Sequence, residues 1–550
     1  MKFFVICALV CCCCAAPSAS YCDTSALQFE DQLAKRGLTG GAVGDFRAPA
    51  RIPQPDEGMS VSEIVADLAQ NGDEAGRATL WREDLAGHTT EFMVTRAPGG
   101  QTLVQYWVLR AGGGCALYQS VVYSKDGRLV TQDFWRNDPQ ALKRAGAPDF
   151  PPDLFPTNAL PIGAFYDAVG RGADGTTGKV ELQAGPYDYI QLDAWVDGAE
   201  KIATPAGTLD TVRVVMRPNV DSVLKSWPAM FRKLALPFIP KDYFYFNTTP
   251  PHQLVKFEGA IGYPAPTLKA RLTKTWTAPA TATSRVGGDL ERALATRGLI
   301  GGVRADPDAS LRQPEPAAGS VVDEIAMTLS ATHQPMTTYR IWHEALGAYV
   351  LEIQETLSPA GQVGINFWVL PREGRGCLVA GVENYSREGR LVSSNLWRDD
   401  PATLRIPGAM AFPDDLYPNI SIPIDAFFRA LDAHDGDGVA KVNLQVSPYT
   451  YISLDTWRAG NETVTTDGGS IAADKVAVRA DVASILPSWP SALRSAVAPF
   501  FPKLMLDYDS AAPHDLIDFH GPLGWPAPTV DLQLTRRYVA GAPTQSASTR

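Results

Sequence analysis

Residues 33–41 read LAKRGLTGG, and residues 294–302 read LATRGLIGG. Gly298 follows Gly37 by 261 positions (298 − 37), and Trp342 follows Trp81 by the same interval. One residue inserted near Arg110 changes the interval to 262, which then holds through the rest of the chain. Self-similarity at one fixed interval predicts a single structural unit that is written twice.

The tryptophans support the same interpretation. Ten of the 12 tryptophans form five pairs at these intervals, and the other two each face a tyrosine. The pairs are Trp81/Trp342, Trp107/Trp368, Trp135/Trp397, Trp195/Trp457 and Trp227/Trp489, with Trp276/Tyr538 and Tyr263/Trp525 as the exchanges. Aromatic side chains kept at matching places predict the same core in both copies.

The 550 residues are also too many for one hydrophobic core. We expect a signal peptide over 1–20, repeat domains over 24–276 and 289–539, a linker over 277–288 and a flexible tail over 540–550.

The N-terminus is typical of an export signal. Lys2 precedes an apolar run from Phe3 to Ala16, and the small residues Pro17 to Ser20 follow it. The run is shorter than a membrane-spanning helix, and no later stretch reaches that length. We therefore expect a secreted or periplasmic protein without a transmembrane segment.

Cysteine count and net charge restrict the function. Three of the eight cysteines, Cys22, Cys115 and Cys377, lie beyond the signal. Three is too few for a disulfide framework, so Cys115 and Cys377 are either small buried thiols or members of a bridge. The chain carries 60 acidic and 49 basic residues, a net charge of −11, and its sequence shows no Lys/Arg cluster. Such a surface repels polyphosphates, so the sequence predicts no nucleic-acid partner.

Each copy is predicted to open with helices. Phe29 and Leu33 before Gly37 indicate a first helix, which 290–298 repeat. Ser60 and Glu63 have the spacing of a capping box, which predicts a second helix over 60–68 and its counterpart over 322–329. Further short helices are expected after Pro161, after Pro423 and after Trp227.

The rest of each copy favours strands. Apolar segments at 115–123 and 129–135 flank the turn KDGR at 125–128, and REGR at 387–390 repeats it. Apolar and polar residues alternate at 190–194, 212–216 and 441–446. The predicted fold class is α+β, mainly antiparallel β, with one curved sheet or half-barrel and packed helices per copy.

Sequence motifs for cofactors and metals fail on inspection. The sequence GRGADG at 170–175 has dinucleotide-binding spacing but follows a helix, and Gly178-Lys179 lacks the hydroxyl residue of a phosphate loop. The loop 435–438 lacks the acids of a calcium site, and His343-Glu344 lacks a second histidine four residues on. We expect neither a cofactor nor a metal.

Several matched polar and aromatic residues are candidates for ligand binding. In FWRNDP (134–139) and LWRDDP (396–401), the arginines and aspartates can form an ion pair or receive an anion. The tyrosines and tryptophans can line a pocket or fill a core, and the one matched histidine pair can bond backbone or act on a ligand. The candidates are Trp135, Arg136, Asp138, Tyr187, Trp195, Trp227, His252, Trp397, Arg398, Asp400, Tyr449, Trp457, Trp489 and His514.

The last hundred residues of each copy resemble an uncharacterised family of bacterial exported domains. The resemblance lies in WVDGAE (195–200), TPAGT (204–208), PHQL (251–254) and FEG (257–259); the second copy departs from it at 466–470, which read TDGGS. Such domains are similar to the half-barrels of periplasmic lipoprotein carriers. The resemblance implies a curved sheet and a helical lid around an apolar cavity, and it offers no catalytic residues.

Three functions are therefore considered. The first is non-enzymatic binding of an apolar or amphiphilic ligand such as lipid. The second is an envelope structural or protein-interaction module with two docking faces. The third is a hydrolase that uses His252 and His514 beside an acid such as Asp193 or Asp455.

Overall fold

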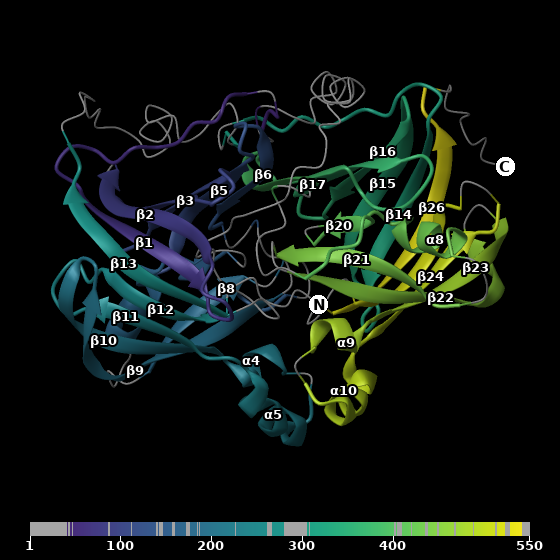
Figure 1. Cartoon of the computed structure of the whole chain (residues 1–550). Helices are drawn as coiled ribbons and strands as arrows, with labels where there is room; N and C mark the ends of the chain where they lie inside the picture. Colours follow the sequence, from purple (N-terminus) through teal and green to yellow (C-terminus); the bar gives the residue numbers. More distant parts are fainter. Residues whose placement is uncertain are drawn as a thin grey trace.

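The computed structural model is organised around one long sheet of 26 strands that curves through both halves of the chain (Figure 1). The described residues are 41–279 and 305–541 apart from 42–43, 47, 86–87, 112, 139–140, 142–146, 157–159, 172–176, 184, 186–187, 226, 261–266, 307–308, 401–402, 404–409, 420, 435–437, 448–449, 467–468, 488, 512–513 and 523–527. The expected signal peptide, the first helix of each copy and the linker beyond 279 lie outside them.

The first half contributes thirteen of these strands. They are β1 (Ser60–Leu68), β2 (Glu74–Leu85), β3 (His88–Arg96), β4 (Thr102–Leu109), β5 (Cys115–Tyr123), β6 (Leu129–Arg136), β7 (Leu154–Phe155), β8 (Thr177–Gln183), β9 (Tyr189–Thr204), β10 (Gly207–Pro218), β11 (Asp242–Asn247), β12 (Leu254–Ala260) and β13 (Thr267–Thr277).

The second half contributes the other thirteen. They are β14 (Val321–Leu329), β15 (Pro335–Leu346), β16 (Tyr349–Leu357), β17 (Val363–Pro371), β18 (Val379–Tyr385), β19 (Leu391–Arg398), β20 (Leu416–Pro418), β21 (Ala440–Ser447), β22 (Thr450–Thr466), β23 (Gly469–Ala480), β24 (Lys503–Asp509), β25 (Leu516–Pro522) and β26 (Thr529–Val539).

Neighbouring strands in the chain mostly pair as antiparallel hairpins. In the first half β1 pairs with both β2 and β13, so the β1–β6 and β8–β13 meanders join through β1. In the second half β14 pairs with β15 and β26 in the same way. Only the short β7 and β20, among the described strands, pair in parallel, with β8 and β21. The mainly antiparallel β prediction is confirmed.

The two halves are joined edge to edge, which corrects the expectation of one sheet per copy. Strand β6 pairs antiparallel with β19 over five residue pairs, from Ser393 opposite Trp135 to Trp397 opposite Thr131. An unpaired sheet edge exposes a row of hydrogen-bonding groups, and pairing the two edges removes it. Sequence patterns do not reveal this pairing because each strand looks the same whichever partner it has.

The joint is symmetric about Asp133 and Asn395. These two residues are 262 positions apart and stand opposite each other, and the Asn395 Nδ2 donates to Asp133 Oδ1 at 2.5 Å. Two identical residues would face each other here if the halves were identical. The pairing of an aspartate with an asparagine supplies one donor and one acceptor, which two aspartates cannot do.

Both faces of the central strands are buried, and this corrects the helix predicted at 60–68. That segment is β1, whose Ile64, Ala66 and Leu68 join one apolar core while Val61 joins another. Residues 322–329 likewise belong to β14. A strand covered on both faces shows no alternation of apolar and polar residues, so its apolar spacing imitates a helix.

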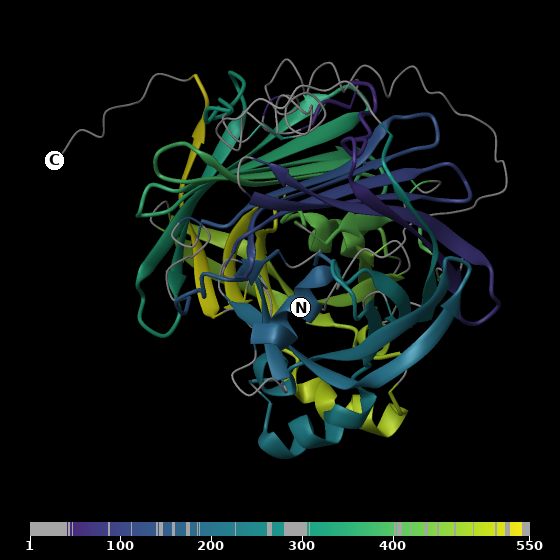
Figure 2. The same cartoon turned by 90° about the vertical axis from the view of Figure 1, so that its left-hand side faces the viewer.

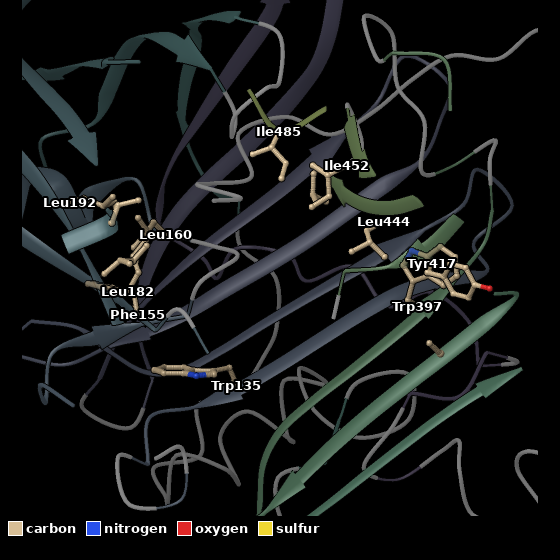
Figure 3. Close-up of a cluster of buried hydrophobic side chains, with 14 of the residues drawn as sticks. Trp135, Phe155, Leu160, Leu182, Leu192, Trp397, Tyr417, Leu444, Ile452 and Ile485 are labelled. Carbon is tan, nitrogen blue, oxygen red and sulfur yellow. The ribbon is translucent and has the colours of Figure 1, made fainter. Parts of the chain in front are cut away.

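The two cores lie on opposite faces of the sheet. Adjacent residues of β4 show this. Trp107 belongs to the core that contains Ile64, which we call the inner core, and Tyr106 belongs to the core that contains Val61, which we call the outer core. The outer core is covered by residues of the segments that precede β1 and β14, among them Phe46, Ile52 and Leu311. The inner core includes apolar side chains from both halves: Phe155, Leu160, Leu182 and Leu192, and across from them Tyr417, Leu444, Ile452 and Ile485 (Figure 3).

The short helices predicted after Pro161, Pro423 and Trp227 are confirmed. They are α3 (Gly163–Arg171), α8 (Ala426–Asp432) and α5 (Ala229–Ala235), with α10 (Ser491–Val497) as the counterpart of α5. The predicted hairpins around 125–128 and 387–390 are also confirmed as β5–β6 and β18–β19. Cys115 and Cys377 are buried free thiols. Burial raises the pKa of both.

Matching tryptophans have matching partners, which supports the repeat interpretation. The Nε1 of Trp81 donates to Glu83 at 2.7 Å, and that of Trp342 donates to Glu344 at 3.0 Å. The Nε1 of Trp135 and of Trp397 donate to Gln183 and Gln445. These paired tryptophans therefore occupy equivalent positions in the two halves.

Candidate functional site

The most distinctive surface lies where helices from the two halves meet beneath the sheet. After β10 come α4 (Val220–Val223), α5 and η1 (Leu236–Phe238); after β23 come α9 (Val482–Ile485), α10 and η2 (Ala498–Phe500). The Asn219 side chain caps α4 by accepting from the Ser222 amide, and Asp481 caps α9 through the Ala483 amide. The two helix groups lie side by side in both views (Figures 1 and 2).

Interlocked aromatic rings hold the two groups together. Trp227 and Trp489, 262 positions apart, contact edge to face with ring centroids 6.4 Å apart. Trp227 also contacts Phe500 and Phe501, and Phe238 contacts Trp489 in return. The predicted ligand-binding indoles Trp227 and Trp489 are therefore buried against the opposite half, and both belong to the inner core.

Large apolar side chains project from α5 and η1 on the outside of this contact. Met230 is 63% exposed, Leu234 47% and Leu236 39%. The residues 262 positions later are Ala492, Ala496 and Ala498. The first half therefore presents a protruding apolar ridge, Met230–Leu234–Leu236, that the second half does not. Isolated exposed apolar residues are ordinary, whereas a cluster marks an interaction surface.

Basic side chains surround the ridge. Residues 224–241, LKSWPAMFRKLALPFIPK, contain four basic residues and no acidic one, although the whole chain has a net charge of −11. Lys233 is exposed, whereas Arg232 pairs with Asp221 at 2.7 Å and Lys225 pairs with Asp188. The adjacent α10 adds Arg494. We call the ridge together with Lys233, Arg232 and Arg494 the helix-tip surface.

Two half-buried tryptophans at the base of the helices add further apolar and basic groups. The charged groups of Arg217 and Lys241 lie over the ring of Trp195, 5.6 and 5.8 Å from its centroid. Trp457 repeats the arrangement with Arg479 and Lys503 at 5.8 and 5.3 Å. Cations over an indole face combine apolar area with positive charge. Trp195 and Trp457 were predicted as site residues from the sequence.

One buried acid lies directly behind Lys241. The Asp242 Oδ1 accepts from the Ala260 amide at 2.9 Å. Burial raises the pKa of Asp242 to about 7, although the Ala260 hydrogen bond opposes the shift. Leu504 stands 262 positions later, so the second half has no acid here.

The matched histidines perform the backbone role that the sequence left open. Both have left-handed φ angles, 57° for His252 and 65° for His514. Their Nδ1 atoms lie 3.0 and 2.9 Å from the carbonyl oxygens of Asn247 and Asp509, and their rings stack on Tyr166 and Phe428.

The acids of the hydrolase hypothesis have other partners. Asp193 accepts from the Asn219 Nδ2 at 3.0 Å, and Asp455 lies 3.5 Å from the Lys441 Nζ. The structure thus offers each histidine and each acid a separate structural contact.

The remaining predicted residues lie at the ends of β6 and β19, away from the helices. Trp135, Arg136, Trp397 and Arg398 are buried, and the Arg398 guanidinium stacks over the Phe46 ring at 4.1 Å. The Asp138 and Asp400 carboxylates accept from the amides of Ala141 and Thr403 and so cap turns. Tyr187 and Tyr449 lie outside the described residues.

The ridge itself was missed at the sequence level. Met230, Leu234 and Leu236 look like the buried face of an ordinary amphipathic helix. An alignment of the two halves could have identified the ridge, because the three corresponding residues of the second half are alanines while the neighbouring tryptophan is the same. The basic residues of 224–241 were not recognised as a cluster either, because apolar residues separate them along the chain, and only the fold adds Arg494 from the other half.

No family model and no curated protein matches this chain. Among solved structures, it is similar to a candidate lipoprotein of Parabacteroides distasonis, with 14% identity, 42% of this chain and 99% of that chain covered, and a TM-score of 0.18. It is also similar to the Pseudomonas aeruginosa MucA/MucB complex structure, with 11% identity, 62% and 87% coverage, and a TM-score of 0.18.

A third similar structure is a candidate exported protein with a YmcC-like fold from Bacteroides fragilis, with 13% identity, 42% and 100% coverage, and a TM-score of 0.17. Scores this low carry no argument about the function of this chain. Among the described helices, none is long and apolar enough to cross a membrane.

Proposed function

We propose that this chain is an exported, non-enzymatic binding protein whose helix-tip surface docks on an anionic lipid surface. The observation that carries the proposal is the exposed ridge of Met230, Leu234 and Leu236, set among basic side chains in an otherwise acidic protein. The ligand class predicted from the sequence, an apolar or amphiphilic molecule such as lipid, is retained. The proposed binding location is now the outer surface of the helices rather than an internal cavity.

The chemistry of the ridge matches a lipid interface. Apolar side chains on a short surface helix enter the boundary between headgroups and acyl chains, and flanking lysines and arginines keep their charges at the headgroups. Each basic residue near an anionic surface contributes about 1 kcal/mol of attraction. The net charge of −11 repels an anionic surface everywhere else, so it orients the molecule with the helix tip forward.

The aromatic contacts between the two helix groups hold the ridge in a fixed position. Phe231 on α5 packs against Phe500 of the other half with ring centroids 5.0 Å apart. The ridge is therefore presented by two packed helix groups rather than by a single seven-residue helix, which would not hold its shape alone.

The test is binding to vesicles of phosphatidylglycerol and of phosphatidylcholine, followed by flotation. The variant Met230→Ala/Leu234→Ala/Leu236→Ala places on α5 and η1 the residues that the second half already carries. Losing the partial burial of three such side chains removes about 2–3 kcal/mol, which weakens binding about 30-fold to 150-fold. Wild-type protein is expected to prefer phosphatidylglycerol and to lose affinity with added salt.

A matched control truncates exposed apolar side chains elsewhere. The variant Leu357→Ala/Met410→Ala/Val439→Ala changes residues that are also exposed but belong to neither of the two helix groups. It should bind vesicles like wild type. Equal binding by wild type and the ridge variant, or no binding by wild type, would refute lipid docking. Wild-type binding that ignores lipid charge would refute the role of the basic residues.

A further inference from the structure

A cluster of His343, Glu352 and Asp425 lies in the second half, apart from the helix-tip surface. His343 on β15 and Glu352 on β16 are direct cross-strand partners, and the His343 Nε2 is 3.4 Å from the Glu352 Oε2. Asp425 precedes α8 and adds its carboxylate. One ligand atom from each residue lies within 4.8 Å of the other two.

The carboxylates of this cluster lack the partners that buried oxygens require. The Glu352 side chain is 1% exposed, and its Oε1 accepts from the Ile424 amide at 3.2 Å. Within the described part of the chain, Asp425 Oδ1 is buried without a hydrogen-bond partner, and Glu352 Oε2 has a long contact of 3.4 Å with the His343 Nε2. Unpaired buried carboxylate oxygens are destabilising unless a cation or a proton compensates them.

The first half shows which cation belongs at this place. Arg82 and Glu91 occupy the corresponding cross-strand positions, and the Arg82 Nε and Nη2 donate to Glu91 Oε2 at 2.9 and 2.7 Å. Gly163 stands where Asp425 stands, and a Cβ on Gly163 would lie 1.7 Å from the Arg82 Nη2. The guanidinium thus fills the space and neutralises the glutamate.

The second half has exchanged that guanidinium for a shorter imidazole and a second carboxylate. Arg429 compensates only part of the added charge, because its Nη1 is 3.5 Å from Asp425 Oδ2, while its Nη2 donates to the Pro371 carbonyl. The Asp425 Oδ1 still faces the cluster. The side chains of His343 and Asp425 are 34% and 22% exposed, so solvent reaches the cluster from their side.

We infer that His343, Glu352 and Asp425 form a binding site for a divalent transition-metal ion of the zinc type, which takes the place of the Arg82 guanidinium. One imidazole nitrogen and two carboxylate oxygens are ligands that zinc accepts, with a further position left for water. Calcium requires six to eight oxygens, which this site does not offer. Zinc ligands stand about 3.3 Å apart in tetrahedral geometry, so small side-chain rotations close the cluster on the ion.

The test is zinc titration of the full chain at pH 7.5 by calorimetry. We expect saturable binding and a higher melting temperature with zinc. The variant His343→Arg/Asp425→Gly installs the residues of the first half. It should fold and bind one zinc ion fewer than wild type, while any ions held by the N-terminal cysteines are common to both.

A matched control is His520→Ala, which removes another histidine–carboxylate pair, since the His520 Nδ1 is 2.6 Å from Asp531 Oδ1. This variant should keep the wild-type stoichiometry. No saturable binding by wild type at millimolar zinc would overturn the proposal. So would an unchanged stoichiometry in His343→Arg/Asp425→Gly, which would place the ion elsewhere.

Discussion

Replacing Asn395 by aspartate places two carboxyl groups face to face at the joint between the halves. Asn395 now donates to Asp133 at 2.5 Å, and burial raises the pKa of Asp133 to about 6 although this hydrogen bond opposes the shift. In Asn395→Asp the donor is lost and two like charges meet. One carboxyl group must then be protonated in the folded protein.

The magnitude follows from the free energy of that protonation. A carboxyl group with an unfolded pKa near 3.9 takes up a proton at pH 8 at a cost of about 5–6 kcal/mol, and at pH 5 of about 1.5 kcal/mol. These values are upper limits, because the strand ends can separate instead. We expect Asn395→Asp to lower the free energy of unfolding by about 3–5 kcal/mol at pH 8 and by about 1 kcal/mol at pH 5.

The assay is urea unfolding of wild type and variant at both pH values, followed by tryptophan fluorescence. The matched control is Asp133→Asn, which leaves two amides that can hydrogen-bond to each other without charge. It should remove the pH dependence that Asp133 contributes: because the pKa of Asp133 is raised to about 6, the wild type loses stability as pH rises from about 4 to 6, and the variant should not. A loss below about 1 kcal/mol at pH 8 in Asn395→Asp, with the same pH dependence as wild type, would refute the β6–β19 pairing.

Two further predictions concern the first half. In Asp242→Asn the amide oxygen can still accept from the Ala260 amide, while the buried charge is removed. Because the folded pKa of Asp242 is raised to about 7, the wild type loses stability as pH rises from 4 to 7. Thermal unfolding should therefore show the variant gaining about 2–3 kcal/mol of stability relative to wild type between pH 5 and pH 8. An equal effect at both pH values would contradict the raised pKa. In Gly178→Ala the new Cβ would lie 2.1 Å from the backbone oxygen of Ala168, where α3 packs on β8. We therefore expect the free energy of unfolding, measured with a chemical denaturant, to fall by about 1–3 kcal/mol. The control is Gly185→Ala, whose Cβ meets open space but whose φ is positive, so that it reports backbone strain without the clash.

The sequence predicted the local elements where turn chemistry and alternation are strong. The turns at 125–128 and 387–390 fixed the hairpins, and proline and aromatic spacing fixed the short helices. It failed at β1, because Val61 and Ile64 are buried on opposite faces and their spacing imitates a helix. For the candidate site, Trp195 and Trp457 were identified, whereas Met230 was not, because exposure depends on neighbours that the sequence does not place.

The sequence by itself predicted the repeat, and it determined the antiparallel hairpins and the aromatic residues of the cores, because these follow from spacing and side-chain type along one strand or turn. Only the tertiary structure decided that β6 joins β19, that Trp227 meets Trp489, and that Glu352 rather than Glu344 faces His343. Such contacts link residues distant in the chain. They depend on which edges and faces remain unpaired after the local elements have formed, and no local pattern records that.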